Sequence, residues 1–475
     1  MTAMRPLMVL GCTSDAGKSL LATALCRWFA RQGISVAPFK AQNMSNNVRV
    51  VAGGEVGLAQ WLQGCAAGVE PTVDMNPVIV KPESDTSSQV VVRGRARLDI
   101  SALPWQERAP ALWEAITEAY SSVAAAHDLV VLEGAGSPAE INLVDQVNNR
   151  IIEHADATGL LVADIDRGGA FAHLFGTWAL APATTRERLF GFAFNKFRGD
   201  PELLAPGPEW LERETGVPTV GVVPMVHHRL PTEEGAATPA VPANADAPRI
   251  AICRFPFGSN LDEFHLLDQV AHVRWATTSG DLDGADLIVL PGSKHVAADR
   301  AWLSDRGLDD AIVAAARSGV RVVGVCGGCM MLGGAIEDEA GVDGTTAGLG
   351  LVDLSTTFAA DKRVVRTTER LAGLPEEWAE LEGVGFDGYE VRHGRIEGSA
   401  HVGAASWARG PVLATAVHGL FENARALDAL FGGATVVDLE ATFDDLADLV
   451  DEHLDTTMIR TAVERGADLR HHETS

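Results

Sequence analysis

The segment LMVLGCTSDAGKS, residues 7–19, decides the fold of the first half of this chain. An apolar run ends in a glycine, and a Gly-Lys-Ser triplet follows where a helical pattern begins. A strand, a glycine loop and a helix in this order are typical of a phosphate-binding loop. The glycines let backbone N–H groups close round phosphate oxygens, and the helix N-terminus adds the positive end of a dipole. We therefore predict that ATP is bound by Gly11, Gly17, Lys18 and Ser19.

The residue types in this loop suggest their roles. Lys18 is expected on the β- and γ-phosphates, and the hydroxyl of Ser19 on Mg²⁺. Five residues separate Gly11 from Gly17, where the usual motif has about four. This longer loop resembles that of the dethiobiotin-synthetase-like enzymes. The competing interpretation is a glycine-containing turn in front of a core helix.

An acidic residue at the end of another apolar run is the expected partner of the metal. Glu133 directly follows Leu129–Leu132 and precedes two glycines, which leave space for a ligand. P-loop enzymes hold Mg²⁺ with such an acid, and ligands bind at the carboxyl ends of strands in open α/β sheets. We predict Glu133 as a metal ligand, with a capping or solvated glutamate as the alternative. Asp164 or Asp166, after a further run, is a weaker candidate.

Short apolar runs and helical patterns alternate along both halves of the chain. Parallel strands that are buried on both faces show such runs. Helices are predicted over 18–32, within 297–318 and along the last forty residues. The predicted strands are Leu7–Leu10, Ile34–Ala37, Leu129–Leu132, Leu160–Ala163, Phe190–Phe194, Val217–Val223, Ile250–Cys253, Leu287–Leu290, Val322–Val325 and Val412–Val417.

A candidate nucleophile follows one of these strands in the second half. Cys326 comes after Val322–Val325 and precedes two glycines and a helix. A nucleophile on so sharp a turn needs small neighbours, because the backbone is crowded there, and the helix N-terminus favours the thiolate. His418 follows Val412–Val417. Cys326 and His418 could therefore meet at one sheet edge as a thiolate–imidazole pair.

Two backbone N–H groups, those of Gly292 and Gly327, are candidates for an oxyanion hole. The C-x-x-C formed by Cys326 and Cys329 leaves zinc binding or dithiol chemistry open as an alternative. A structural zinc site needs about four ligands, and no second such pair lies near in the sequence. A buried inert cysteine and a satisfied core histidine are the structural alternatives for Cys326 and His418.

A segment rich in alanine and proline, residues 231–248, separates the two halves. It has no apolar period and is typical of a linker. We therefore expect a P-loop ATP-binding domain at 1–230, a second α/β domain at 249–440 and a helical extension at 441–475.

The composition excludes several classes of function. The 475 residues are 47% hydrophobic and 21% charged, as expected for globular domains. The formal charge of −26 argues against a nucleic-acid partner, which calls for a basic face. No stretch reaches about 18 uninterrupted apolar residues, the length that a membrane-spanning helix needs, so we expect no membrane span. Six cysteines without a disulfide pattern fit a reducing, cytoplasmic location.

Short segments in order along nearly the whole chain resemble the glutamine-hydrolysing cobyrinate amidotransferases, and among them the cobyric acid synthase branch. A single P-loop would be far less specific than this set. The segments are PFKAQNMSNN at 38–47, MNP at 75–77, KP at 81–82, SSQV at 87–90, EGAGSPAEINL at 133–143, DIDRGG at 164–169, NKFRGD at 195–200, GVVP at 221–224, LPGSK at 290–294, GYE at 388–390 and HGLFEN at 418–423.

The resemblance implies an α/β chain of two domains, in which a P-loop ATPase with a parallel sheet is followed by a flavodoxin-like class I glutaminase. It implies amidation of the b, d, e and g carboxylates of adenosylcobyrinic acid a,c-diamide with glutamine, ATP and Mg²⁺, and no tightly bound organic cofactor. The carboxylate would be activated by phosphorylation and attacked by ammonia from the second domain. A homo-oligomer is compatible with this chemistry.

The resemblance also concerns single residues. The acid that many glutaminases carry two positions after the histidine is Leu420 here, so we expect a catalytic dyad, with Glu422 close in sequence. Cys329 and Met330 stand where the family usually has Tyr and Gln. Basic residues assigned as a group to ATP or corrin carboxylates, with solvated surface charges as the alternative, are Lys40, Lys81, Arg167, Lys196 and Arg198.

Two rival functions stay open at this point. One is amidation of the a and c carboxylates of cobyrinic acid, against which the runs at 43–47 and 137–143 weigh. The other is a P-loop switch or binding protein with an inactive glutaminase-like domain. The presence of both Cys326 and His418 weighs against that second rival.

Overall fold

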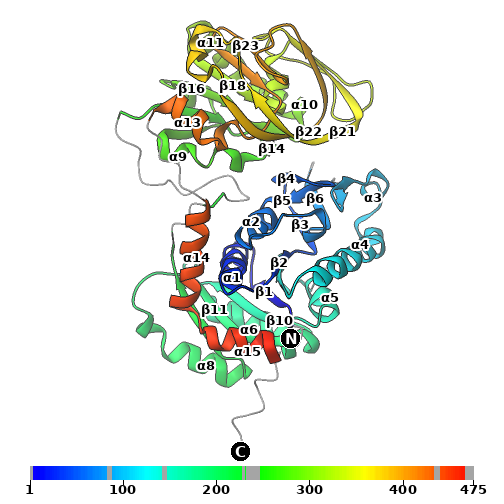
Figure 1. Cartoon of the computed structure of the whole chain (residues 1–475), viewed down its shortest axis with the longest axis vertical. Helices are drawn as coiled ribbons and strands as arrows, with labels where there is room; N and C mark the ends of the chain where they lie inside the picture. Colours follow the sequence, from blue (N-terminus) through cyan, green and yellow to red (C-terminus); the bar gives the residue numbers. More distant parts are fainter. Residues whose placement is uncertain are drawn as a thin grey trace, which may run out of the picture.

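The structure is a computed structural model of the chain, in which two α/β domains lie end to end (Figure 1). Most of the linker predicted at 231–248 lies outside the residues that the structure describes. Among the described residues, none of the helices has the length and hydropathy needed to cross a bilayer. The described residues are 4–82, 88–141, 147–226, 230–231, 246–432 and 439–465.

Six parallel strands form the main sheet of the first domain. Most of their residues are buried and apolar, because helices cover both faces of the sheet. The P-loop follows the strand near the centre. In order across the sheet, the strands are β12 (Thr219–Pro224), β11 (Leu189–Phe197), β10 (Thr158–Asp164), β1 (Leu7–Gly11), β9 (Leu129–Glu133) and β2 (Val36–Phe39).

Different helices cover the two faces of this sheet, and each face has its own apolar core. The first core contains α1 (Lys18–Arg31), α2 (Leu58–Ala66), α14 (Leu439–His453) and α15 (Thr456–Arg465). The second contains α3 (Leu98–Ser101), α4 (Trp105–Ala126), α5 (Val147–His154), α6 (Ala170–Leu180) and α8 (Pro206–Thr215), with α7 (Ala183–Arg188) at their edge.

The chain returns to the first domain after completing the second. In α14, Asp444 pairs with Arg27 of α1 at 2.8 Å, and Asp451 accepts from the indole N–H of Trp28 at 2.6 Å. The backbone N–H of Asp455 donates to the carbonyl of Val220 on β12 at 2.7 Å. The C-terminal helices therefore belong to the core of the first domain.

Smaller strands of the first domain lie toward the second domain (Figure 1). A four-stranded sheet contains β3 (Gln42–Met44), β6 (Val78–Pro82), β7 (Ser88–Val92) and β8 (Arg95–Ala96). Beside it, β4 (Val48–Val51) and β5 (Gly54–Gly57) form a hairpin. Sequence analysis predicted none of these strands.

The second domain has a six-stranded sheet, parallel except for one edge strand. Across it run β15 (His272–Ala276), β13 (Arg249–Cys253), β16 (Leu287–Leu290), β18 (Arg321–Val325), β24 (Val412–Thr415) and β23 (Ser406–Arg409). Its α-helices are α9 (Leu267–Val270), α10 (Val296–Asp305), α11 (Leu308–Arg317), α12 (Gly327–Leu332) and α13 (Ala424–Phe431). Its short 3₁₀ helices are η3 (Leu261–Phe264), η4 (Ser279–Leu282), η5 (Glu376–Leu381) and η6 (Leu420–Glu422).

A long hairpin extends this domain toward the first one (Figure 1). It consists of β21 (Leu354–Arg370) and β22 (Gly385–Gly398). Four short strands complete the domain. β14 (Gly258–Ser259) pairs with β17 (Gly292–Ser293), and β19 (Ala335–Glu337) pairs with β20 (Thr346–Ala347) and β21.

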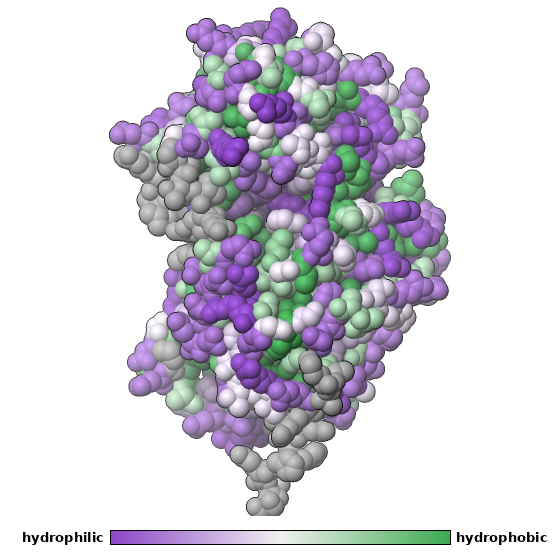
Figure 2. All heavy atoms as spheres, in the orientation of Figure 1, coloured by the Kyte–Doolittle hydropathy of each residue, from purple (hydrophilic) through white to green (hydrophobic). Residues whose placement is uncertain are grey.

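The predicted two-domain α/β class is confirmed. Each predicted strand occurs. The largest difference at a strand end is at Phe190–Phe194, which is β11 at Leu189–Phe197, and Ile34–Ala37 is shifted as a whole to β2 at Val36–Phe39. The helical pattern predicted within 297–318 is two helices, α10 and α11. On the face shown in Figure 2, hydrophilic residues cover most of both domains, and an apolar strip runs down the middle of the first.

Candidate active sites

The P-loop joins β1 to α1 and is closely packed around Lys18. The Lys18 ammonium is buried and donates to the carbonyl of Thr13 at 3.0 Å. A Cβ on Gly11 would lie 2.8 Å from Lys18 Nζ, and a Cβ on Gly17 would lie 1.8 Å from Asn195 Nδ2. Gly17 also has φ 94°, which favours glycine. Gly17 is therefore required by its backbone conformation, and a side chain at Gly11 would displace Lys18.

Glu133 lies beside this loop and is held as an anion by donors on both oxygens. Its Oε1 accepts from Ser19 Oγ and from Lys40 Nζ, both at 2.8 Å. Its Oε2 accepts from the amides of Gln60 at 3.2 Å and Gln63 at 2.5 Å. Burial works against the carboxylate, but these donors, Lys40 first, outweigh it and lower the pKa of Glu133.

The donors around Glu133 fit a magnesium site in chemical type. Hydroxyl and carboxylate oxygens are the ligands that Mg²⁺ prefers, and Ser19 Oγ and Glu133 Oε1 lie 2.8 Å apart. Sequence analysis missed Gln60 and Gln63. Their spacing of three residues on α2 places both amides on one face of the helix, and this was the available signal.

Two of the predicted basic residues converge on the P-loop. Lys196 Nζ lies 3.0 Å from Asp15 Oδ2 and 3.1 Å from Asp164 Oδ2. Arg167 approaches the same two carboxylates, at 2.6 Å and 3.5 Å. Asp164, a weaker candidate for a metal ligand, is therefore paired with cations.

Lys40, also of the predicted basic set, contacts Glu133 beside the loop, whereas Lys81 and Arg198 lie elsewhere. Lys81 is buried and pairs with Glu55, which also pairs with Lys362 of β21 at 2.5 Å. Burial lowers the pKa of Lys81 to about 7, whereas the two lysines overcome the effect of burial and lower the pKa of Glu55 to about 2. Arg198 is exposed and pairs with Asp166 at 3.0 Å.

Cys326 stands on a strained turn between β18 and α12. Its φ of 51° and ψ of −104° are costly for a residue with a side chain. A Cβ on Gly327 would lie 2.7 Å from the backbone nitrogen of Ser293, and a Cβ on Gly328 would lie 2.0 Å from the carbonyl oxygen of Leu290. The two glycines therefore permit the turn that presents the thiol, as the sequence pattern predicts.

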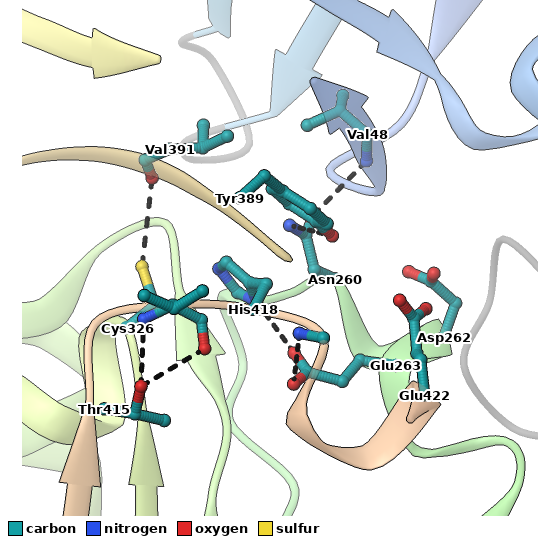
Figure 3. A network of polar contacts seen from close by, with 12 residues as sticks. Val48, Asn260, Asp262, Glu263, Cys326, Tyr389, Val391, Thr415, His418 and Glu422 are labelled. Atoms are coloured by element: carbon teal, nitrogen blue, oxygen red, sulfur yellow. Dashed lines mark hydrogen bonds and ion pairs between the residues drawn. The ribbon is translucent and has the colours of Figure 1, made fainter. Parts of the chain in front are cut away.

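The thiol and the imidazole predicted to form a pair are in contact. The two side chains lie beside each other (Figure 3), and the charge of Cys326 helps to raise the pKa of His418. Cys326 Sγ also lies 3.8 Å from the carbonyl oxygen of Val391. A Cβ on Gly292 would lie 3.0 Å from His418 Cε1. Both predicted oxyanion donors, Gly292 and Gly327, therefore lie beside this pair.

A third residue, Glu263, completes this centre, and the expectation of a dyad is wrong. Glu263 Oε2 lies 2.8 Å from His418 Nδ1, and Glu263 Oε1 accepts from the backbone N–H of Gly419 at 3.0 Å (Figure 3). Glu263 and His418 are both fully buried. Leu420, at the position of the usual acid, is a core residue. Glu263 lies 155 residues before the histidine, in a 3₁₀ helix of four residues that is too short to show a hydrophobic period in the sequence.

The charges at this centre place a proton on the histidine. Burial disfavours the imidazolium, but the charge and hydrogen bond of Cys326, and then those of Glu263, raise the pKa of His418 to about 10. At neutral pH His418 therefore carries a proton that it can give to a leaving group.

The C-x-x-C pair gives no sign of a metal. Cys329 is fully buried in α12, and burial raises the pKa of its thiol. All six cysteines are free. Within the described ranges, no group of three His, Cys, Asp or Glu side chains is placed to hold a metal ion.

The Lys18→Ala variant tests the phosphate site. Because Lys18 is the cation of the loop, its loss should lower ATP turnover by about 100-fold or more, measured as phosphate release. Arg425→Ala removes an exposed cation of α13 and serves as the control. Unchanged turnover in Lys18→Ala would remove this loop from the account.

The Glu263→Gln variant tests the third residue of the thiol centre. Since the Glu263 carboxylate raises the pKa of His418, the neutral amide should move the imidazole titration to lower pH, as measured by NMR. Glu397→Gln makes the same change at an exposed position of β22 and should leave the titration in place. A titration identical to wild type in Glu263→Gln would contradict the contact.

Comparisons with known proteins match both domains. The model for the CobQ/CobB/MinD/ParA nucleotide binding domain matches residues 7–233, and that for the CobB/CobQ-like glutamine amidotransferase domain matches residues 249–426. A cobyric acid synthase of Polaromonas sp. (strain JS666 / ATCC BAA-500) is 48% identical, over 97% of this chain and 99% of its own length.

Two further relatives show the same extent of similarity. A cobyric acid synthase of Variovorax paradoxus (strain S110) is 51% identical over 96% of this chain and 98% of its own length. Another, of Paracidovorax citrulli (strain AAC00-1), is 52% identical over 95% of this chain and 97% of its own length. The similarity spans both domains and both sites, and the chain belongs to the cobyric acid synthase family.

Proposed function

We propose that this chain amidates the b, d, e and g carboxylates of adenosylcobyrinic acid a,c-diamide, with glutamine as nitrogen donor and ATP as energy source. The observation that carries the proposal is the presence in one chain of a P-loop beside Glu133 and a buried Cys326–His418–Glu263 centre. The relatives named cobyric acid synthase support the substrate.

The thiol centre would release ammonia from glutamine. The Cys326 thiolate attacks the side-chain amide carbon, and the N–H groups of Gly292 and Gly327 receive the oxyanion. His418 gives its proton to the departing nitrogen, which leaves as ammonia, and a thioester forms. Water, deprotonated by His418, then cleaves the thioester to glutamate and regenerates the thiol. Glu263 keeps the imidazole oriented throughout.

The P-loop centre would activate the corrin carboxylate. Transfer of the γ-phosphoryl group of ATP gives an acyl phosphate and ADP, and ammonia displaces phosphate to form the amide. Lys18 stabilises charge on the transferred group. Ser19 and Glu133 would hold Mg²⁺, which neutralises phosphate charge.

Ammonia has to reach the second centre unprotonated, because ammonium has no lone pair with which to attack. Apolar side chains that pack next to the thiol favour neutral ammonia over ammonium. Val391, whose carbonyl oxygen lies 3.8 Å from Cys326 Sγ, packs against buried Val48, Ile79 and Val91 of the first domain. An apolar setting disfavours the charged form.

The proposal assigns a function to each of the expected domains. Residues 1–230 supply the synthetase and 249–440 the glutaminase, while 441–475 support the synthetase. Arg167 and Arg198 are the exposed members of the predicted basic set, 61% and 62% by side chain, and would meet corrin carboxylates. We extend the proposal to a cytoplasmic enzyme, free to form homo-oligomers.

The Cys326→Ala variant separates the two half-reactions. It should lose glutamine-dependent amidation by about 1,000-fold or more, because the nucleophile is gone. It should keep amidation supported by ammonium chloride, because the ATP site is untouched. Mass spectrometry of the corrin product counts the amides in both assays.

Parallel assays of the wild-type enzyme with cobyrinic acid and with its a,c-diamide separate the proposed activity from amidation at a and c. Four added amides on the a,c-diamide agree with the proposal, which names four carboxylates (b, d, e and g). Amidation of cobyrinic acid at a and c alone would replace it with the sister activity. Loss of both activities in a folded Cys326→Ala variant would contradict the division of labour.

A further inference from the structure

The β4–β5 hairpin of the first domain reaches the thiol centre of the second. The backbone N–H of Val48 donates to Asn260 Oδ1 at 3.2 Å, and the Asn260 amide donates to Tyr389 Oη at 3.1 Å. Figure 3 shows this chain of contacts beside His418. The hairpin is therefore joined by hydrogen bonds to the residues that surround the catalytic histidine.

Arg49, the next residue of β4, carries a charge into this interface. It is buried, and its Nη2 lies 2.5 Å from Asp262 Oδ2. The same nitrogen pairs with Glu422, and Nη1 donates to Tyr389 Oη at 2.9 Å. Burial works against the guanidinium, but Asp262 and Glu422 outweigh it and raise the pKa of Arg49. The side chain is therefore a fixed cation with three partners in the other domain.

Tyr389 connects this cation to the histidine. Its ring stacks on the His418 imidazole, with centroids 5.1 Å apart and planes 16° from parallel. The two backbones are also paired, through His418 N–H to the Tyr389 carbonyl at 2.9 Å and the reverse bond at 3.2 Å. By holding the Tyr389 hydroxyl, Arg49 also holds the Tyr389 ring against which the His418 imidazole stacks.

Arg49 also balances acids beside the triad. Asp262 precedes Glu263 in η3, and Glu422 lies in η6, just after His418 (Figure 3). Burial outweighs the opposing charge of Arg49, and the net result is a pKa of Glu422 raised to about 7. Buried carboxylates that lose their cation repel one another or take up protons. The field at His418 therefore depends on a residue of the first domain.

We propose that Arg49 is a positioning residue of the glutaminase centre, supplied by the ATP-binding domain. It holds Tyr389 against His418 and balances the acids beside Glu263. The thiol centre is complete only while the two domains are docked. This inference rests on the proposed function and adds that glutamine hydrolysis depends on a side chain outside the glutaminase domain.

Arg49→Ala and Arg49→Lys in the full chain, with Arg366→Ala as the matched control, test this inference. Arg366 reaches the same hairpin from β21, where its Nε donates to the Val50 carbonyl at 2.8 Å and its Nη2 pairs with Glu70 at 2.8 Å. The Arg366 backbone faces Tyr389 across the β21–β22 ladder, but its side chain contacts Val50 and Glu70. Arg366→Ala therefore removes an interdomain side-chain contact that does not include the Tyr389 hydroxyl.

Arg49→Ala should lower kcat for glutamine hydrolysis by about 10- to 100-fold, because small misplacement of a reacting group is costly. The KM for glutamine and the ammonia-dependent amidation should stay at wild-type values. Arg49→Lys should give an intermediate kcat, since lysine keeps the charge and loses the forked geometry. Arg366→Ala should hydrolyse glutamine at the wild-type rate.

Equal kcat values for Arg49→Ala and Arg366→Ala would overturn the inference. A parallel fall in ammonia-dependent amidation would also overturn it, because that result describes general damage to the fold. Wild type that releases no glutamate would instead defeat the proposed function itself.

Tyr389→Phe provides a second variant that does not depend on the folding of Arg49→Ala. It keeps the ring on His418 and removes the oxygen to which Arg49 donates. Its kcat for glutamine hydrolysis should fall while the KM for glutamine stays unchanged. A wild-type kcat would contradict the role of this contact.

Discussion

The thiol centre is arranged around one buried contact, which joins His418 Nδ1 to the carboxylate of Glu263. The histidine ends the segment after β24, the acid comes from η3, and the thiol stands on the turn after β18. These elements come from distant parts of the second domain. Breaking a buried charged pair by removing one partner costs about 3–5 kcal/mol, so this contact constrains both the fold and the chemistry.

Charged side chains also join the two domains. Arg49 crosses the domain boundary to reach Asp262 and Tyr389, while Lys362 crosses in the opposite direction to reach Glu55. These contacts favour one way of docking the two domains, because any other arrangement would leave a charge unpaired at a buried interface, which is costly. Docking of the domains and assembly of the thiol centre are therefore aspects of one arrangement.

Local patterns predicted the parts of this molecule that depend on local physics. The P-loop at 7–19 and the turn at Cys326 are short segments in which glycine, charge and strand position act together. Buried parallel strands have nearly continuous apolar runs, so their places followed from the sequence. Boundaries shifted by a few residues, as at β2, because the ends of strands are set by neighbours.

The elements that sequence analysis missed depend on contacts distant in the chain. Glu263 is one acid among many, and only the fold brings it to His418. The β4–β5 hairpin has buried charged residues that pair across the domain boundary, namely Arg49 with Asp262 and Glu55 with Lys362. A charge satisfied across an interface looks like a surface charge in the sequence.

The central claim is that one chain couples a glutaminase to an ATP-dependent amidation. The direct measurement supplies glutamine labelled with ¹⁵N at the side-chain amide, ATP, the corrin a,c-diamide and an excess of unlabelled ammonium, and determines ¹⁵N in the product amides by mass spectrometry. The account predicts amides that carry ¹⁵N from glutamine in spite of the excess. Product nitrogen diluted to the isotopic composition of the solution would contradict it.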